Sequence, residues 1–456
     1  MEKQENTMEK RYGLPTALSM VIGIVIGSGI FFKAVKVMNL TGGNMIESMI
    51  VIGVVGLICI VCSMLFARMG RKYAKCNGLV DYAEVTLGPK YAYYMGWYLS
   101  TFYFPIIAST LAYIAATYFC MMVGLPMHGQ ASTALGALFL VVLVCVNMLN
   151  PKIAGKLQVS TTVIKLIPLI AMTVVGLIIG IGNGTTIQTI EMSKALGGDV
   201  NAVFGGVCAF AFSYEGWISA TAINQELKNA KRDLPLALII GGLFCTALYM
   251  LYVLSMSATL TPQEIIAAGD NLPMIAFGNV FGQVAGKVVM AFIVISCLGT
   301  SNGMMMCTMR GFYSLAVRNQ GPKPEVLATI DKDTGMPLKS CILGLLFAGF
   351  WYFQFSTLCL QGPLVFNTIN TPLWFFAWEA DEICIIAIYL MYIPIFLHCI
   401  FREKEFSFVY RYVLPILAIV ASLFMSYCAY ISYGAYQMIS FLVTLLIVMI
   451  IGRILK

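Results

Sequence analysis

Two short polar segments that contain glycine interrupt long apolar stretches of the chain. The first is Gly27-Ser28-Gly29 and the second is Ser213-Tyr214-Glu215-Gly216. Glycine inside a helix costs roughly 1 kcal/mol relative to alanine, so each segment predicts a helix break. A break exposes free N–H groups at one half-helix end and free C=O groups at the other, which attract a carboxylate and an ammonium group respectively. A zwitterionic α-amino acid carries both.

The two breaks lie at matching depths in the stretches that contain them, residues 14–34 and 201–225. If both stretches span a membrane, they enter it from opposite sides, which is typical of an inverted repeat whose first helices are discontinuous. The alternative is ordinary close packing, because Gly23 and Gly27 form the spacing that brings membrane helices together. Because the two interruptions lie at matching depths, we favour helix breaks over close packing.

Two ionisable side chains fall deep inside apolar stretches, Lys165 and Glu215. A charge at the bilayer centre is costly, so each is a candidate for a functional role. Lys165 is expected about 12 Å into its span, near the midplane of a hydrocarbon core about 30 Å thick. The alternatives for Lys165 are a structural ion pair or snorkelling to the membrane surface.

Glu215 has three possible roles that the residues alone leave open. It can solvate the side chain of a substrate, exchange a proton, or line a watery outer vestibule. A separate acidic group, Glu379, Asp381 and Glu382, is expected to be solvated surface.

The composition excludes a soluble protein. Hydrophobic residues make up 60% of the chain and charged residues only 11%, whereas soluble domains carry about 25% charged residues. The net charge of +7 comes from no long basic run, so no nucleic acid partner is expected. The 14 cysteines form no CxxC pair and the chain has two histidines, so we expect no metal site, no cofactor and no enzyme centre.

Twelve segments are long and apolar enough to cross a bilayer. They are residues 14–34, 45–67, 91–123, 132–149, 157–182, 201–225, 236–258, 288–309, 338–354, 382–401, 411–430 and 434–453. The prediction is an all-α polytopic membrane protein of one domain, residues 1–456, with inverted repeats at 12–180 and 200–401 and two additional helices at 411–453. Residues 68–90 are expected to form an inner loop with helical character, and residues 355–381 an outer loop or re-entrant piece.

The basic residues predict the orientation of these spans. With the N-terminus inside, the basic residues fall in inner segments, apart from Lys165 in a span and Lys33, Lys36, Lys194 and Lys287 outside. Positive charge on the inner side is what membrane insertion favours. Both termini are therefore expected in the cytoplasm, in a multi-pass protein of the cell membrane.

Three stretches together resemble the amino acid–polyamine–organocation superfamily, and within it the bacterial relatives of the L-type amino acid transporters. They are Ile26 to Phe31, Phe210 to Trp217 followed by Glu226 to Asn229 and Leu234-Pro235, and Cys297 to Gly303 with Arg310. The resemblance covers roughly residues 12–400. It implies a LeuT-like bundle of twelve helices, a five-plus-five inverted repeat with discontinuous helices 1 and 6, and alternating access.

The resemblance also implies a substrate site at the two breaks, with an amino acid as the partner. Val25, Ile26, Ser28 and Gly29 would receive the substrate carboxylate, and the carbonyls of Phe212 and Glu215 its ammonium group. Phe212 would act as an aromatic gate. The neighbouring residues assigned to the same site are Gly27, Ile30, Ser213, Tyr214 and Gly216.

Lys165 matches the position at which sodium-independent members of the superfamily carry a lysine. In related transporters a sodium ion braces the broken first helix there, so the resemblance implies that the ammonium group replaces this ion. Thr300, Ser301 and Asn302 are expected as its neighbours.

The chain departs from the family pattern at several positions. Ala230 replaces a usual proline, Glu215 stands where the L-type branch often has glycine, and Ile218 replaces an asparagine found in some members. The loop at residues 124–130 has no cysteine, so no disulfide-linked heavy subunit is expected.

The resulting expectation is sodium-independent exchange of small neutral or polar amino acids. The alternative is proton-coupled uptake of amino acids, amines or polyamines, with Glu215 recognising a polar or cationic side chain. A membrane enzyme would need a converging catalytic constellation, and a channel would need an open polar path; neither pattern is visible in the sequence.

Overall fold

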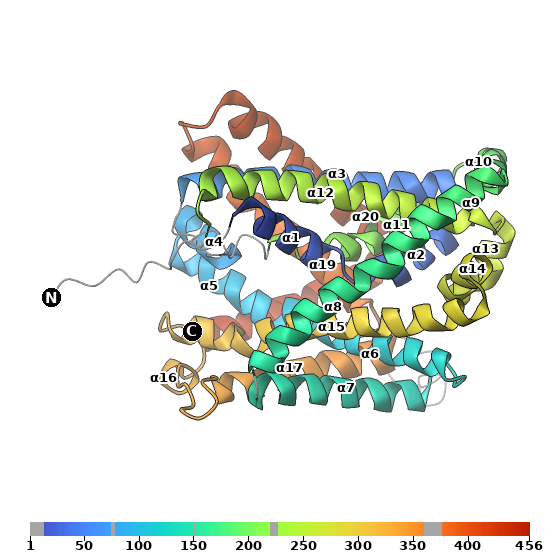
Figure 1. Cartoon of the computed structure of the whole chain (residues 1–456). Helices are drawn as coiled ribbons and strands as arrows, with labels where there is room; N and C mark the ends of the chain where they lie inside the picture. Colours follow the sequence, from blue (N-terminus) through green and yellow to red (C-terminus); the bar gives the residue numbers. More distant parts are fainter. Residues whose placement is uncertain (1–12, 74–77, 150, 219–226, 360–375) are drawn as a thin grey trace.

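The computed structural model describes residues 13–73, 78–149, 151–218, 227–359 and 376–456. Within these ranges the regular elements are all helices, as the composition predicts. Most of the long helices run side by side across the view of Figure 1. The predictions for the N-terminal residues, for Glu226 and for residues 360–375 lie outside the described residues.

Nine helical stretches within the described ranges are long and apolar enough to cross a membrane. They are built from α3 (Met45–Lys72), α5 and α6 (Pro89–Tyr98 and Phe104–Met122), α7 (Gln130–Leu149), α8 and α9 (Pro151–Ala171 and Leu177–Gly182), α12 (Ala230–Ser255), α15 (Gln283–Ala316), α17 (Leu338–Phe353), α19 (Ala380–Arg402) and α20 (Leu414–Ile454).

The first and sixth predicted spans form shorter helices that stop at the predicted breaks. The first is divided into α1 (Leu14–Val25) and α2 (Gly29–Leu40). The sixth begins as α11 (Val200–Phe210) and continues as a 3-10 turn, η3 (Ala211–Tyr214). The last two predicted spans both lie in α20, where Gly434 adopts φ 75° and ψ 169°. This left-handed φ favours glycine and divides α20 at the predicted junction.

Short helices connect the spans at the two ends of the bundle. The predicted helical loop at residues 68–90 contains α4 (Leu79–Leu87). At the same end lie α16 (Pro324–Leu327) and the C-terminus, whereas α10 (Thr185–Ala195) and α13 (Pro262–Ala268) lie at the opposite end (Figure 1). A fifth connecting helix, α14 (Leu272–Phe281), follows α13.

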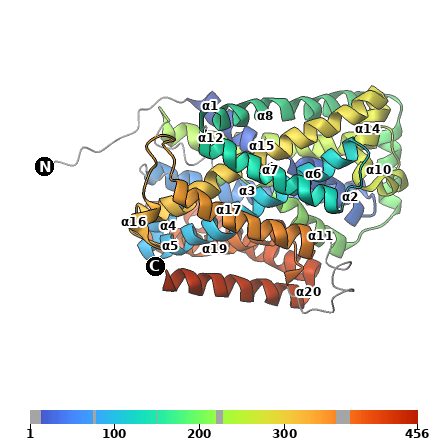
Figure 2. The same ribbon diagram turned by 90° about the horizontal axis from the view of Figure 1, so that it is seen from below.

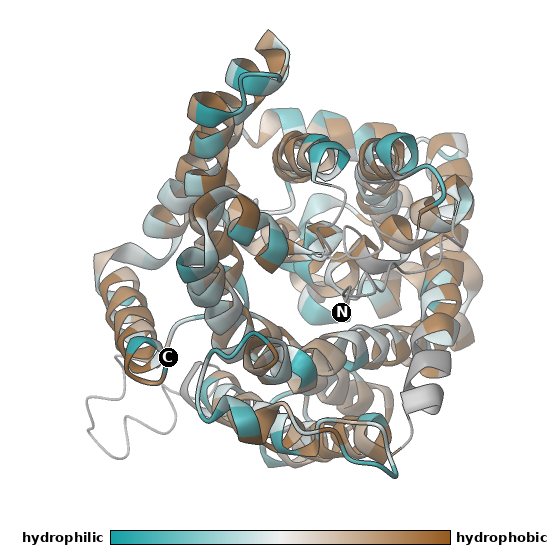
Figure 3. Ribbon diagram, turned by 90° about the vertical axis from the view of Figure 1, so that its left-hand side faces the viewer, coloured by the Kyte–Doolittle hydropathy of each residue, from teal (hydrophilic) through white to brown (hydrophobic). Residues whose placement is uncertain are grey.

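Apolar residues cover most of the helical surface, as a lipid environment requires. Seen from the end that holds α4 and α16, the helices are largely hydrophobic and the hydrophilic patches gather in connecting segments (Figure 3). α20 lies along one edge of the bundle (Figure 2), where it packs on α3, α11 and α19.

Glycines bring the helices around α1 unusually close together. A Cβ atom on Gly23 of α1 would lie 2.6 Å from Thr162 Cγ2 of α8. On the other side of α1, a Cβ atom on Gly241 of α12 would lie 2.6 Å from Val21 Cγ1. Because each of these contacts has a glycine on one side, α8 and α12 both pack closely on α1.

Candidate functional site

The first helix break leaves backbone carbonyls of α1 without their usual partners. In a continuous helix the N–H of Gly27 would donate to the carbonyl of Gly23, four residues earlier. It instead donates to the carbonyl of Val25 at 2.7 Å. The carbonyl of Gly23 is thereby left free, in a buried position where it needs a donor.

Lys165 of α8 supplies that donor. Its Nζ atom donates to the Gly23 carbonyl at 2.8 Å, and the residue is only 3% exposed. The structure therefore brings Lys165 to the broken helix, at the turn immediately before the break.

The three residues grouped with Lys165 in the sequence point in different directions. Thr300 lies beside Gly27, with its Oγ1 atom 3.6 Å from where a Cβ atom of that glycine would stand. Ser301 donates to the Ala108 carbonyl of α6 at 2.8 Å, and Asn302 accepts from the Asn147 side chain of α7 at 2.8 Å. These two hydrogen bonds join α15 to α6 and α7, away from α1.

The second break follows η3. Glu215 adopts an extended conformation with ψ 154°, and Gly216 has φ 101°. This φ is one that residues with a Cβ atom rarely adopt, so glycine permits the chain to leave the helix here. The backbone thus departs from a helical path in the segment that the sequence singles out.

The two breaks touch each other. A Cβ atom on Gly29 would lie 2.9 Å from Ser213 Cα and 3.0 Å from Phe212 Cδ1. Tyr249 of α12, which the sequence does not single out, also joins them: its hydroxyl lies 2.8 Å from the Val25 carbonyl and 3.0 Å from the Ser213 carbonyl.

A small cavity of about 20 Å³ lies between the breaks. This volume is enough for about one water molecule. Three residues that the sequence does not assign to the substrate site line this cavity, namely Ile107, Thr300 and Met304. The predicted residues that line it are Val25, Gly27, Ser28, Gly29, Phe212, Ser213 and Glu215.

Four predicted residues are not part of this lining. Ile26 and Ile30 are fully buried in the surrounding apolar core. The Tyr214 hydroxyl points to α3, where it donates to the Ile52 carbonyl at 3.1 Å. Gly216 shapes the second break through its backbone conformation.

Ser28, Ser213 and Glu215 place buried polar atoms at this cavity. Among the described residues, no hydrogen bond of standard geometry is found for Ser28 Oγ, Ser213 Oγ or either carboxyl oxygen of Glu215, although the Cys297 thiol approaches Ser28 and the Gly216 N–H approaches Glu215. The Tyr103 hydroxyl, also buried and without a bond of standard geometry, approaches the Glu215 carboxyl. A buried polar group without a partner is destabilising. A polar ligand in this cavity would supply the missing hydrogen bonds.

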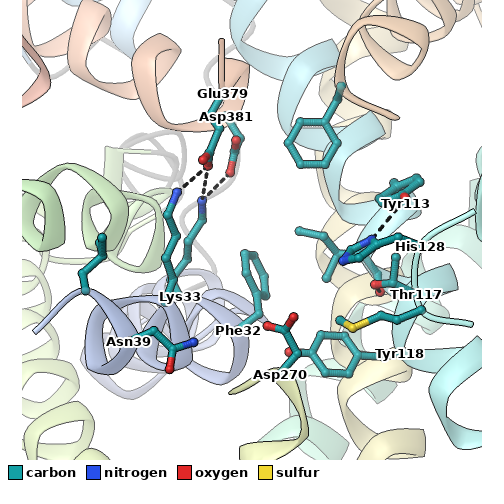
Figure 4. A pocket seen from close by; sticks show the side chains of 15 residues that line it. Phe32, Lys33, Asn39, Tyr113, Thr117, Tyr118, His128, Asp270, Glu379 and Asp381 are labelled. Carbon is teal, nitrogen blue, oxygen red and sulfur yellow. Dashed lines mark hydrogen bonds and ion pairs between the residues drawn. The ribbon is translucent and has the colours of Figure 1, made fainter. Parts of the chain in front are cut away.

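The structure also contains a larger pocket of about 420 Å³, which is shown in Figure 4. Its walls include Tyr113, His128, Asp270 and Phe32. The rings of Phe32 and Phe212 pack against each other with centroids 5.4 Å apart. Since Phe32 lines the large pocket and Phe212 the small cavity, this aromatic pair stands between the two spaces.

The expectation that Glu379, Asp381 and Glu382 are solvated surface is wrong for Asp381 and Glu382, whose side chains are 1% exposed. Lys33 Nζ lies 2.7 Å from Asp381 and 2.5 Å from Glu382. Lys36 Nζ lies 2.5 Å from Glu379 and 2.8 Å from Glu382. Figure 4 shows Lys33 pointing toward Glu379 and Asp381.

The cluster forms because α2 carries both lysines against the first turn of α19. Lys33 is only 4% exposed, so it is a buried charge in addition to Lys165 and Glu215. A buried cation and a buried carboxylate tolerate burial because each neutralises the other.

The long apolar helices are those of a multi-pass membrane protein, and two breaks that meet at a buried cavity are typical of transporters with discontinuous helices. A model of the amino acid permease family matches residues 12–453, and the chain belongs to this family. Its members are transporters and not enzymes, and their substrates are amino acids.

Individual relatives are similar over most of their length. The chain is 28% identical over 433 residues to the serine/threonine exchanger SteT of Bacillus subtilis (strain 168), covering 93% of this chain and 92% of that protein. It is 24% identical over 446 residues to the b(0,+)-type amino acid transporter 1 of Mus musculus, covering 96% and 86%. It is 24% identical over 344 residues to the human cystine/glutamate transporter, covering 74% and 66%.

Proposed function

We propose that this chain exchanges small neutral or polar amino acids across the cytoplasmic membrane, by alternating access and without sodium. The observation that carries the proposal is the meeting of two helix breaks around a buried cavity, where Ser28, Ser213 and Glu215 lack hydrogen bonds of standard geometry among the described residues. The similarity to an exchanger of serine and threonine supports the choice of small, polar substrates.

The proposed architecture is a LeuT-like bundle of twelve helices. Residues 12–180 and 200–401 form the two inverted repeats, and residues 411–453 add two helices. The nine long stretches among the described residues, the interruptions of the first and sixth predicted spans and the division of α20 at Gly434 support this count. The distribution of basic residues supports cytoplasmic termini.

In the proposed complex the zwitterion lies between the breaks. The first N–H groups of α2 have no acceptor within their helix, so the backbone around Ser28 and Gly29, with Val25 and Ile26, receives the carboxylate. The carbonyls of Phe212 and Glu215 receive the ammonium group. The backbone alone can thus recognise any α-amino acid. Selectivity among amino acids must then come from the protein side chains that contact the substrate side chain.

Phe212 is the proposed gate. The cavity beneath it, at about 20 Å³, is too small for an amino acid, whereas the pocket beyond Phe32 has about 420 Å³. The substrate site must therefore expand when the Phe32–Phe212 contact opens. Alternating access then requires a corresponding opening on the opposite side of the breaks.

Lys165 is proposed to replace a coupling cation. In this role its ammonium group holds the free carbonyl of Gly23, as a bound sodium ion would do. The proposed transporter also works without a disulfide-linked heavy subunit, since residues 124–130 contain no cysteine.

The test is transport by the full chain in proteoliposomes loaded with unlabelled serine. We expect labelled serine to accumulate from outside by counterflow, equally in sodium and choline buffers. Unlabelled serine, threonine and alanine should compete more strongly than leucine or putrescine. Uptake that needs no internal amino acid, or that depends on sodium, would refute the exchange mechanism.

A second candidate is proton-coupled or cation-selective uptake, which the buried carboxyl of Glu215 favours, since no cationic side chain is paired with it among the described residues. Its positive partner would be a proton or the side chain of a cationic amino acid or amine. In that case an inward pH gradient drives uptake without internal substrate, or lysine and putrescine compete better than alanine.

Replacing Glu215 with glutamine tests whether this carboxyl contacts the substrate side chain. We expect the preference for serine and lysine over alanine to fall by about tenfold, because a hydrogen bond to a charged group is lost and the backbone contacts remain. The measurement is the inhibition constant of each amino acid against labelled serine.

Glu191→Gln on α10 is the matched control, since the Glu191 side chain is 63% exposed at the end of the bundle. It should leave all three inhibition constants unchanged. An unaltered rank order in Glu215→Gln would assign Glu215 to the vestibule wall and not to side-chain recognition.

A further inference from the structure

Glu382, in the first turn of α19, binds two different parts of the molecule with its two carboxyl oxygens. Its Oε1 atom accepts from Lys33 Nζ at 2.5 Å and from Lys36 Nζ at 2.8 Å. Its Oε2 atom accepts instead from the Tyr433 hydroxyl of α20. The side chain is 1% exposed, so these donors, and not bulk water, satisfy it. Glu382 thus joins α2, which carries both lysines, to α20.

Tyr433 supplies a donor that the ion pairs lack. Three carboxylates share the two lysines of α2, namely Glu379, Asp381 and Glu382. Both lysines bind Glu382 at the same oxygen, and the Tyr433 hydroxyl is the donor to the other. A buried carboxyl oxygen without a donor is destabilising. The hydroxyl therefore stabilises the arrangement in which Glu382 is buried, relative to any arrangement in which water reaches this carboxyl group.

The bend of α20 lies directly beside Tyr433. The next residue is Gly434, whose φ of 75° divides the helix. The same helix also packs on α11, where the ring of Phe204 lies 5.6 Å from Tyr427 and 5.9 Å from Phe424 between centroids. α20 therefore contacts both the helix that leads into the second break and the carboxylate that binds α2.

The ion pairs reach the aromatic rings of the proposed gate. Lys33 Nζ lies 5.4 Å from the centroid of the Phe212 ring and 5.7 Å from that of Phe32. Lys33 follows Gly29 by four residues, so both lie on the same face of α2, and Gly29 is where α2 touches the second break. When α2 moves away from the second break and α19 stays in place, Lys33 must leave Glu382.

We propose that Tyr433 biases the transporter toward the state in which its outer side is closed, by holding Glu382 where it binds both lysines of α2. Residues 411–453, which the proposed architecture sets outside the two repeats, thus take part in the outer gate. Tyr433 is a positioning residue, since it lines neither of the two cavities described above and acts through Glu382. The inference rests on the proposed alternating access and on the proposed orientation, which puts the start of α19 at the outer face.

The experiment measures uptake of labelled serine by intact cells that express the full chain, with uptake by cells lacking it subtracted. Intact cells present only the outer side of the transporter to the label. The apparent affinity for external substrate rises with the fraction of transporters that is open to the outside. In Tyr433→Phe we expect the apparent KM to fall about fivefold, the effect of losing one buried hydrogen bond. The maximal rate should fall as well, because the outer side closes less readily.

Glu382→Gln is the second variant, and it distinguishes a closed gate from simple electrostatic attraction. Glutamine has nearly the same shape but lacks the charge that binds both lysines, so the apparent KM should fall by more than in Tyr433→Phe. If the carboxylates served only to attract the ammonium group of the substrate, removing one of them would raise the apparent KM. The two explanations thus predict changes of opposite sign.

Tyr430→Phe is the matched control. Tyr430 lies on the same helix as Tyr433 and is 50% exposed, so its hydroxyl is solvated and its loss removes no buried hydrogen bond. This variant should keep the wild-type KM and the wild-type maximal rate.

The outcomes separate the two proposals. A wild type that takes up no serine refutes the proposed function, and this inference with it. An active wild type combined with an unchanged or raised KM in Tyr433→Phe refutes only the role of Tyr433. A lowered maximal rate at unchanged KM also refutes it, because that pattern means loss of folded protein and not a shift between two states. A fall in KM in both Tyr433→Phe and Glu382→Gln supports the proposal.

Discussion

Replacing Lys165 with methionine is expected to lower the initial rate of serine counterflow by about tenfold or more, the effect of losing a hydrogen bond from a charged donor. Lys165 Nζ is 2.8 Å from the Gly23 carbonyl, which the break has deprived of its helical partner. Methionine keeps an unbranched apolar stem but cannot donate. The end of α1 then loses the group that holds it against α8.

The measurement is counterflow at equal amounts of reconstituted protein, with Lys194→Met as the matched control. Lys194 is 59% exposed and paired with Glu191 on its own helix, α10, so its loss should leave transport unchanged. Normal counterflow by Lys165→Met would contradict the role of the ammonium group. So would a wild type that needs sodium, because the site would then still require a cation.

The two breaks could be predicted because their cause is local. Gly27 and Gly29, or Glu215 followed by Gly216, oppose a continuous apolar helix whatever surrounds them. Lys165 could be singled out for the same reason, as a charge within an apolar run. Its partner, the Gly23 carbonyl, could not be predicted, because the backbone acceptor becomes free only once the path of the break is known.

The buried ion pairs could not be predicted because their partners are distant in sequence. Lys33 and Glu382 are 349 residues apart, and each lies close to the end of an apolar stretch, where charges are usually solvated. Hydropathy describes each segment separately. Only the fold, which brings the lysine side chains of α2 to the start of α19, shows that these charges neutralise each other inside the bundle.

Helix geometry explains why Thr300, Ser301 and Asn302 do not act as one group. Successive residues of a helix point about 100° apart, so three consecutive side chains cannot all face Lys165. Thr300 faces the cavity, and the other two face α6 and α7. Tyr249 was missed for a different reason: it is one of 23 tyrosines, and nothing in its local sequence marks the one that reaches both breaks.

Adding a single methyl group to the first break is expected to be tolerated at Gly27 and not at Gly29. A Cβ atom on Gly29 would lie 2.9 Å from Ser213 Cα, and this backbone atom cannot move without separating the two breaks. On Gly27 the nearest atom would be Thr300 Oγ1, at an ordinary contact distance of 3.6 Å. Neither glycine has a positive φ, so both positions accept an alanine backbone.

We therefore expect Gly29→Ala to lower serine counterflow by about tenfold or more, since overpacking costs about 1–3 kcal/mol, and Gly27→Ala to change it by less than about threefold. The pair shares the loss of a glycine and the gain of one methyl group, so it isolates the contact between the breaks. Counterflow is compared at equal protein in proteoliposomes. Equal activity of the two variants would show that the breaks need not touch, and the site would then have to lie elsewhere than at their junction.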